Sequence, residues 1–310
     1  MIPLPPLPPL PPFALDLIAI GETMIALAPA PGESLRTATA LLVDHAGAES
    51  NTCVGLARLG LQVAWVSCLG VDAAGDRILD ALAREGVELR WVRRDPRRPT
   101  GVMIKEPAAG VRYYRSGSAA SMLSPEDLAD VPLSDARAVL VTGVTALIGP
   151  QPHAAGLALL AASRAPLRIV DPNLRDGLWG SERRVELVMP FVERCDLLLT
   201  GERELAELLG ESNDVKTLAR RAATRGPREI VVRAPAIVGA LDANGAWYEL
   251  DVRRDLAVDP IGAGDAFNAG YIAVRLRGGT IDEALRAGAR CGAAVTTAVS
   301  DTAAFPRRLG

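Results

Sequence analysis

Short apolar runs alternate with longer segments of helical pattern along most of this chain. Because strands that alternate with helices form βαβ units, the pattern predicts an α/β fold with a mainly parallel sheet and helices on both faces. The expected strands are LDLIAIG (15–21), VAWVSCLG (63–70), AVLVTGV (138–144), LRIVDPN (167–173), DLLLTGE (196–202) and EIVVRAP (229–235). The expected helices span residues 51–59, 73–84, 152–163, 181–194, 215–224, 263–276 and 281–298.

Two regions depart from this rhythm. Residues 87–116 show strand-like alternation with turn signals and no helical period, which predicts a small β-appendage on the α/β body. Residues 1–13 are rich in proline, which removes backbone donors and opposes a helix, so an extended, disordered tail is expected there. We find no internal repeat and no linker that would divide the body into independent domains.

Composition is that of an ordinary globular protein. The chain has 310 residues, 49% of them hydrophobic, with a net charge of −3, and nothing in this balance points to nucleic acid or to a membrane surface. No run reaches the roughly 20 apolar residues that a membrane span needs. The four cysteines are scattered without a CxxC pair, which favours reduced, buried thiols in a cytoplasmic protein.

Scarce residue types exclude several kinds of site. With two histidines, His45 and His153, the chain has no HExxH zinc motif and little material for a Ser-His-Asp triad. Its two lysines, Lys105 and Lys216, follow Ile104 and Val215, so the GxxxxGK[ST] phosphate loop is absent. If the protein binds phosphate, another device must hold it.

The stretch VDPIGAGDAFNAG, residues 258–270, offers such a device. Gly262, Ala263 and Gly264 are expected in the first turn of the helix 263–276, where backbone N–H groups lack intrahelical partners and the helix dipole favours an anion. Asp265 would project its carboxylate beside the bound anion. An acid in that place suits a base that accepts a proton from a hydroxyl attacking phosphorus.

Other interpretations of an isolated GxGD remain open. Asp265 could simply accept hydrogen bonds from first-turn N–H groups, with the glycines forming a turn. A dinucleotide fingerprint would instead open the first βαβ unit, whereas this glycine run follows the last expected strands.

Two longer motifs carry a resemblance to a known family. DPIGAGDAFNAGY resembles the C-terminal signature of the ribokinase-like, or PfkB, carbohydrate kinases, and AGAESNTCVGLARLG (46–60) resembles their N-terminal signature. The resemblance covers about residues 15–306. It implies a three-layer α/β/α sandwich over residues 14–310, with a β-sheet lid contributed mainly by about 35–46 and 87–116.

Three further stretches are most similar to 2-keto-3-deoxygluconate kinases within that family: GETMIAL (21–27), RYYRSGSAAS (112–121) and DPNLRDGLW (171–179). A sugar acid carries a carboxylate that the planar fork of arginine matches, so Arg115 and Arg175 are candidate anchors. The alternative for Arg175 is an ion pair inside the body. Tyr113 and Tyr114 should point to opposite faces of a strand, and Tyr113, on the face of Arg115, is expected to meet the substrate.

The resemblance also implies roles for individual residues. Asp265 would be the base, the turn Gly262–Gly264 the anion hole, and Glu204 a residue that organises magnesium through water. The cofactors implied are ATP and Mg²⁺, with a monovalent cation as a further possibility, and the lid is expected to join a homo-oligomer. The remaining expected contacts are Gly47, Ala48, Asn51, Met103 and Asp301 with the substrate, and Asn173 and Arg233 with the nucleotide.

Several positions depart from the family pattern. Gly201 replaces the asparagine of its NxxE motif, Arg233 begins a strand end that lacks the usual glycines, Ala289 stands where an asparagine often lies near adenine, and Met103 replaces a lid aromatic. Despite these departures, the resemblance and the two candidate arginines predict a sugar-acid kinase that phosphorylates 2-keto-3-deoxygluconate. The alternatives are a kinase for another sugar, such as fructose, and a catalytically weak sugar-acid-binding protein.

Overall fold

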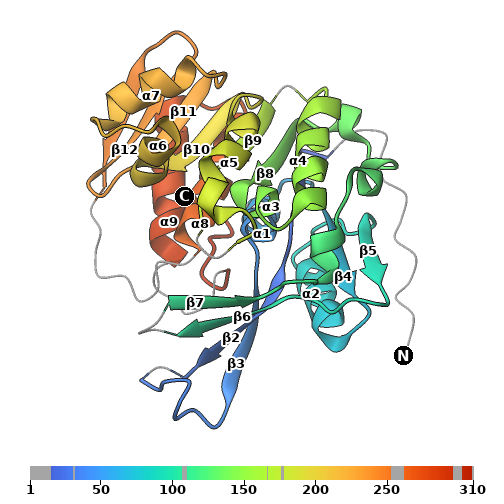
Figure 1. Cartoon of the computed structure of the whole chain (residues 1–310). Coiled ribbons are helices and arrows are strands. Elements are labelled where there is room, and N and C mark those ends of the chain that lie inside the picture. Colours follow the sequence, from blue (N-terminus) through green and yellow to red (C-terminus); the bar gives the residue numbers. More distant parts are fainter. Residues whose placement is uncertain are drawn as a thin grey trace.

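The described part of the chain forms two β-sheets, one large and one small, with helices packed on the large one (Figure 1). The computed structural model describes residues 15–30, 32–106, 110–165, 167–175, 178–252, 262–295 and 302–308. The proline-rich segment 1–13 lies outside this part of the chain, as does Asp301.

The large sheet runs in the order β13-β12-β11-β10-β9-β8-β1-β4-β5. Its strands from β5 to β11 pair in parallel, whereas the last two pair antiparallel, so the predicted mainly parallel sheet is confirmed. The strands are β1 (Leu17–Ile20), β4 (Val63–Gly70), β5 (Val92–Asp95), β8 (Ala138–Thr142), β9 (Leu167–Asp171), β10 (Leu197–Gly201), β11 (Glu229–Arg233), β12 (Ile237–Leu241) and β13 (Trp247–Asp251).

Each central strand is buried on both sides because its alternating side chains enter two different cores. In β1, Leu17 and Ala19 pack into one apolar cluster, whereas Ile18 and Ile20 pack into the other. The first cluster also holds side chains of α1 (Ala48–Arg58), α2 (Ala73–Arg84), α8 (Ala263–Leu276) and α9 (Ile281–Val295). The second holds side chains of α4 (Pro150–Ala162), α5 (Arg184–Val192), α6 (Glu202–Leu209) and α7 (Val215–Ala223).

Most of the expected helices form, with small shifts at their ends. Helices α2 and α8 begin and end at the predicted residues. Helix α1 begins three residues earlier than expected, directly after Gly47, whose extended backbone ends the preceding strand. Two helices were not predicted, α6 and the short α3 (Gly143–Ala146). None of the described helices is both long and apolar enough to span a membrane.

The small sheet has the order β3-β2-β6-β7 and confirms the expected second β-structure. Its strands are β2 (Met24–Pro29), β3 (Leu41–Ala46), β6 (Val102–Glu106) and β7 (Gly110–Tyr114). The predicted appendage 87–116 divides between the sheets, because β5 pairs with β4 of the large sheet while β6 and β7 enter the small one. The exact boundaries of the domain and of the lid stay a prediction.

Candidate functional site

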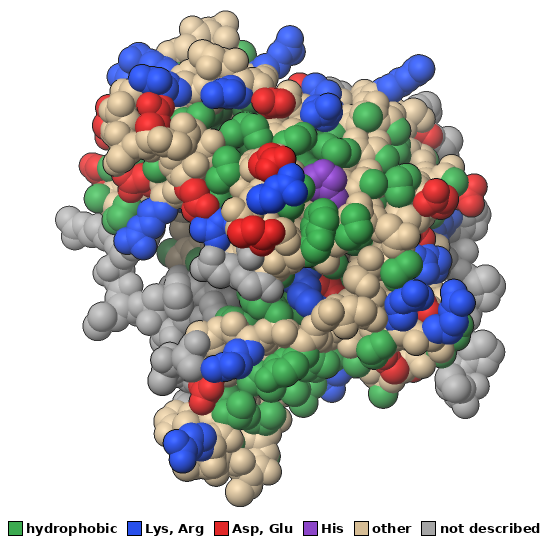
Figure 2. Space-filling model, in the orientation of Figure 1, with side chains coloured by type: hydrophobic (Ala, Val, Ile, Leu, Met, Phe, Trp, Pro, Cys, Tyr) green, Lys and Arg blue, Asp and Glu red, His purple; other side chains and the backbone are tan. Residues whose placement is uncertain are grey.

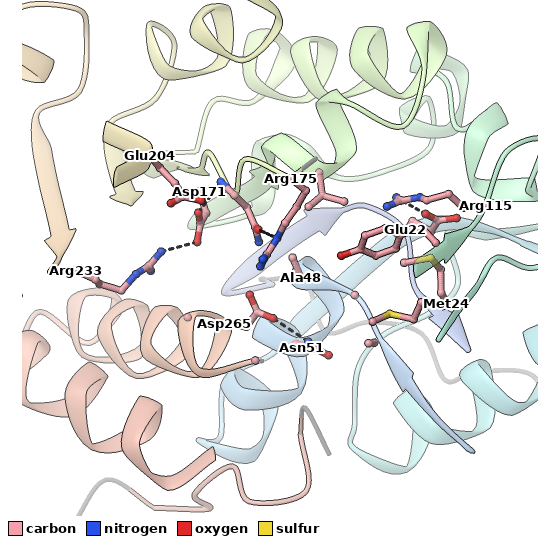
Figure 3. A pocket seen from close by; sticks show the side chains of 18 residues that line it. Glu22, Met24, Ala48, Asn51, Arg115, Asp171, Arg175, Glu204, Arg233 and Asp265 are labelled. Carbon is pink, nitrogen blue, oxygen red and sulfur yellow. Dashed lines mark hydrogen bonds and ion pairs between the residues drawn. The ribbon is translucent and has the colours of Figure 1, made fainter. Parts of the chain in front are cut away.

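A cavity of about 340 Å³ opens between the carboxyl ends of the large sheet, the start of α8 and one face of the small sheet (Figure 3). Ligands of open α/β sheets commonly bind at this edge. The predicted residues on its wall are Gly47, Ala48, Asn51, Met103, Tyr113, Arg115, Asn173, Arg175, Glu204, Arg233, Gly262, Gly264 and Asp265. Residues of the wall that the sequence did not single out are Glu22, Met24, Ala46, Val144 and Asp171.

The start of α8 forms one side of the cavity. Gly262 precedes the helix with φ of 84°, a left-handed conformation that glycine adopts without strain. Ala263 follows it as the first helical residue, and Ala266 is the first to donate to a carbonyl of this turn, that of Gly262. The preceding backbone N–H groups belong to the positive end of a 14-residue helix, which favours an anion.

Asp265 lies in the same first turn and is oriented by a residue from the other end of the chain. Its Oδ2 accepts a hydrogen bond of 2.8 Å from Asn51 Nδ2 (Figure 3). Helices α1 and α8 can approach so closely because Gly55 faces Ala269, where a Cβ on Gly55 would lie 2.6 Å from the alanine methyl. The packing of these two helices therefore fixes the direction of the Asp265 carboxylate.

Asp171, at the end of β9, is the centre of a buried polar network beside α8. Its Oδ2 accepts a hydrogen bond of 2.7 Å from Asn268 Nδ2 and lies 3.2 Å from Arg233 Nη2. Arg233 Nη1 also donates to Asn268 Oδ1 at 2.5 Å, and its guanidinium lies 5.7 Å from the centre of the Phe267 ring. Arg233, which takes the place of the lysine in the family pattern, is therefore held by three neighbours.

Glu204 lies next to this network, in the first turn of α6. Its two carboxylate oxygens accept backbone N–H bonds from Gly201 at 2.9 Å and from Leu174 at 3.0 Å. Burial raises the pKa of Glu204, and the nearby charge of Asp171 raises it further, whereas Arg233 lowers it. A cation near these two carboxylates would relieve their repulsion. Among the described residues, no group of three or more His, Cys, Asp or Glu side chains could hold a metal ion directly.

Arg175 lies at the mouth of the cavity. Its side chain is exposed, and its Nε donates a hydrogen bond of 2.6 Å to Asn173 Oδ1. Asn173 has φ of 36°, a conformation that asparagine tolerates better than most residues. Arg175 thus contacts an amide at the cavity instead of forming the ion pair inside the body that we considered as its alternative role.

Arg115 is placed differently from the expectation. Its Nη2 is in ionic contact with Glu22 Oε2, without the alignment of a hydrogen bond. The side chains are 8% and 1% exposed, so the positive charge of Arg115 is balanced inside the protein. Its guanidinium also lies 5.7 Å from the ring centre of Tyr113. Tyr113 faces the cavity as predicted. We expected Tyr114, on the other face of the strand, to pack against neighbouring side chains, but it is 59% exposed.

Nearly the whole chain is similar to several known proteins. The model of the pfkB family of carbohydrate kinases matches residues 14–308. The chain is 33% identical to a 2-dehydro-3-deoxygalactonokinase of Haloferax volcanii, covering 93% of each chain. It is 29% identical to a 2-dehydro-3-deoxygluconokinase of Thermoproteus tenax, covering 94% of this chain and 91% of the relative. The fold matches an E. coli protein described as a putative ribokinase II in complex with ATP and Mg²⁺, with a TM-score of 0.87, 21% identity, and 94% and 96% of the two chains covered.

Proposed function

The chain belongs to the pfkB family of carbohydrate kinases, and from this premise we propose that it transfers the γ-phosphoryl group of ATP to the terminal hydroxyl of 2-keto-3-deoxygluconate. Two relatives with nearly complete coverage are named for kinases of 2-dehydro-3-deoxy sugar acids. One of them acts by its name on the galactonate form, so 2-keto-3-deoxygalactonate is a second candidate substrate.

In this proposal Asp265 is the general base. Its carboxylate accepts the proton of the substrate hydroxyl as the oxygen attacks the γ-phosphorus. The hydrogen bond from Asn51 holds the carboxylate in the cavity before substrate arrives. Backbone N–H groups of Gly262, Ala263 and Gly264 form the anion hole, where the helix dipole stabilises negative charge on the transferred phosphoryl oxygens.

The polar network at the strand ends suits the nucleotide side. Arg233 and Asn173 would contact phosphate oxygens, and Glu204 would hold Mg²⁺ through water, with Asp171 next to it. The donor set fits because burial and the nearby charge of Asp171 raise the pKa of Glu204, and a cation beside these two carboxylates would stabilise their negative charge. When bound, the metal neutralises charge on the β- and γ-phosphates. The solved neighbour with ATP and Mg²⁺ supports this choice of cofactors.

The small sheet and the start of α1 would bind the sugar acid. Gly47 and Ala48 lie next to Asn51 at the start of α1, and Met103 with Tyr113 covers the opposite side of the cavity. Arg175 is our main candidate for the substrate carboxylate because its charge faces the cavity. Arg115, already paired with Glu22, adds shape and less net charge. Asp301 stays a predicted substrate contact outside the described residues.

The observation that carries the proposal is the Asp265 carboxylate at the start of α8. Asn51 of α1 orients this carboxylate, and Arg175 lines the same cavity. The test incubates purified protein with Mg-ATP and a panel of sugars and sugar acids, followed by mass spectrometry and phosphorus NMR of the products. We expect the keto acids to gain one phosphate on the terminal oxygen. Phosphorylation of fructose in place of the keto acids would support the alternative of a kinase for another sugar. Binding of a keto acid without its phosphorylation would support the alternative of a weak sugar-acid-binding protein.

We also propose that the small sheet joins two copies of the chain. Figure 2 shows apolar side chains gathered over this sheet, and Leu42, Val43 and Tyr114 of its strands are 51%, 44% and 59% exposed. Leu42 and Val43 project from opposite faces of the edge strand β3 and Tyr114 from the other edge strand, β7, so the sheet exposes apolar side chains at both edges, as is common at interfaces. Light scattering coupled to size exclusion should report a dimer or larger oligomer, and Leu42→Glu should shift it toward the monomer.

A further inference from the structure

The chain passes between the large and the small sheet at four places in its described part. These connections lie between β1 and β2, between β3 and α1, between β5 and β6, and between β7 and the 3₁₀ helix η1 (Ala119–Met122). Residues on both sides of these connections line the cavity, so the relative position of the two sheets sets the geometry of the site.

Glu22 lies in the first connection, where its side chain is close to the connections after β5 and β7 and its backbone carbonyl is close to the one after β3. Its Oε1 accepts a hydrogen bond of 2.9 Å from Ser118 Oγ, and its Oε2 pairs with Arg115, both in the connection after β7. A Cβ on Gly101 would lie 2.8 Å from Glu22 Oε1, and a Cβ on Gly47 only 2.3 Å from the Glu22 carbonyl oxygen. Glycine is therefore required at position 47, where the neighbour is the Glu22 backbone, and at position 101 it leaves room for the Glu22 carboxylate.

The contacts of Glu22 extend to the substrate side of the cavity. The ion pair fixes Arg115, whose guanidinium lies 5.7 Å from the ring centre of Tyr113. Tyr113 is on the small sheet, whereas Asp265 is on the body, so neither can hold the other in place by local structure. A buried charge pair is costly to break because the remaining charge stays uncompensated, which makes it suited to fixing one arrangement.

We propose that Glu22 is a positioning residue that holds the small sheet against the body and, through Arg115, sets Tyr113 against the sugar. This role rests on the proposed function only for the identity of the sugar. Glu22 acts through its neighbours in this proposal and takes no part in the phosphoryl transfer.

Hydrogen–deuterium exchange of the full-length protein without substrate tests the positioning role first. Glu22→Gln keeps the shape but removes the charge, and amides of β2, β6 and β7 should then exchange about tenfold faster or more, while those of β8 and β9 keep wild-type rates. Ser118→Ala removes only one hydrogen bond and should give a smaller rise in the same strands.

Glu229→Gln is the matched control. Glu229 is also a mostly buried acid, 13% exposed, and pairs with Arg275 at 2.8 Å in the body. It should leave exchange in β2, β6 and β7 unchanged. Wild-type rates in these strands of the Glu22→Gln protein, or a uniform rise over the whole molecule, would overturn the positioning role.

Kinetics with the sugar that the wild-type protein phosphorylates best provide the second test. Glu22→Gln should raise KM for the sugar about fivefold or more and change kcat less than threefold, since the base is untouched. In an Arg115→Met background the same change should not raise KM further. An equal rise in both backgrounds would show that Glu22 does not act through Arg115. This result does not depend on the sugar being a keto acid. A failure of the positioning role can therefore be told apart from a failure of the proposed function.

Discussion

The two sides of the cavity treat charge in different ways. At the strand ends, Asp171 and Glu204 lie close together, and one guanidinium, that of Arg233, is within 4 Å of Asp171. On the small-sheet side of the described cavity wall, Glu22 is matched by the guanidinium of Arg115, and the surroundings are apolar side chains such as Met24. We therefore expect the first side to receive charged ligands, and the second, where the two charges balance, to select substrate largely by shape.

The largest expected effect is at the base. Asp265→Asn should lower kcat by about a hundredfold or more, because a positioned base contributes at least that much, while substrate affinity changes little. Steady-state kinetics measures this effect. Asp282→Asn is the control, since it changes another first-turn acid, in α9. A kcat near the wild-type value in Asp265→Asn would remove the base from the mechanism.

Next in size is the loss of Arg175. A charge-assisted contact to a carboxylate contributes about 1.5–3 kcal/mol, so Arg175→Ala should raise KM for the keto acid about ten- to a hundredfold. Turnover of a slow neutral sugar should hardly change. Arg183→Ala, in an exposed ion pair nearby, serves as the control.

The comparison also predicts that Arg115→Lys raises KM less than Arg175→Ala does, because Arg115 is balanced by Glu22. Lysine there still loses the planar fork. If Arg115→Lys instead had the larger effect on KM, the carboxylate would bind at the small sheet, and our description of that side as neutral toward substrate would be wrong.

A smaller effect is expected on the nucleotide side. Arg233→Ala should raise KM for ATP about tenfold, because it removes a phosphate contact and leaves Asp171 uncompensated. KM for the sugar acid should stay near its wild-type value. The control Arg228→Ala changes an exposed arginine just before β11. Equal effects on ATP and on sugar would contradict the division of the cavity into two sides.

The smallest effect concerns stability and pH. Glu204 has a pKa above its usual 4.5 in the folded protein, mainly through burial. The folded state therefore binds the proton more tightly than the unfolded state, and the free energy of unfolding falls as pH rises from 4.5 through the folded-state pKa. Glu204→Gln removes this loss, so its stability relative to wild type, measured by urea titration at several pH values, should increase as the pH rises above 4.5.

Urea titration of Glu22→Gln should show a lower free energy of unfolding, because the substitution breaks a matched pair and leaves Arg115 buried without its partner. Its protein should be less stable than wild type at neutral pH. A Glu204→Gln protein whose stability relative to wild type does not change with pH would contradict the difference between the two sides.

Much of the fold was predictable because local signals and burial agree. Helix α2 begins where expected because Asp72 accepts a hydrogen bond from Gly75, a standard N-cap. Helix α6 was missed since its eight residues are strongly charged and show only a short apolar stripe. The β12–β13 hairpin was missed because Gly239, which a strand pattern disfavours, is required there for close packing on Trp247.

The cavity was predicted where a motif marked it and missed where a contact spans the chain. Asp265 and Asn51 stood in recognisable glycine-containing stretches, although they are 214 positions apart. Glu22 and its partner Ser118 lie in two of the quoted stretches, 96 positions apart, but neither stretch indicates that these two side chains meet. One signal was present: an acid directly after the apolar run LDLIAIG must be exposed, paired or functional.

The most direct measurement of the central claim is the ratio of kcat/KM for 2-keto-3-deoxygluconate to that for fructose, with the same enzyme and saturating Mg-ATP. We expect a ratio of about a hundred or more, because fructose lacks the carboxylate that Arg175 would bind. A ratio near one, or a preference for fructose, would contradict the sugar-acid assignment and leave only membership of the carbohydrate kinase family.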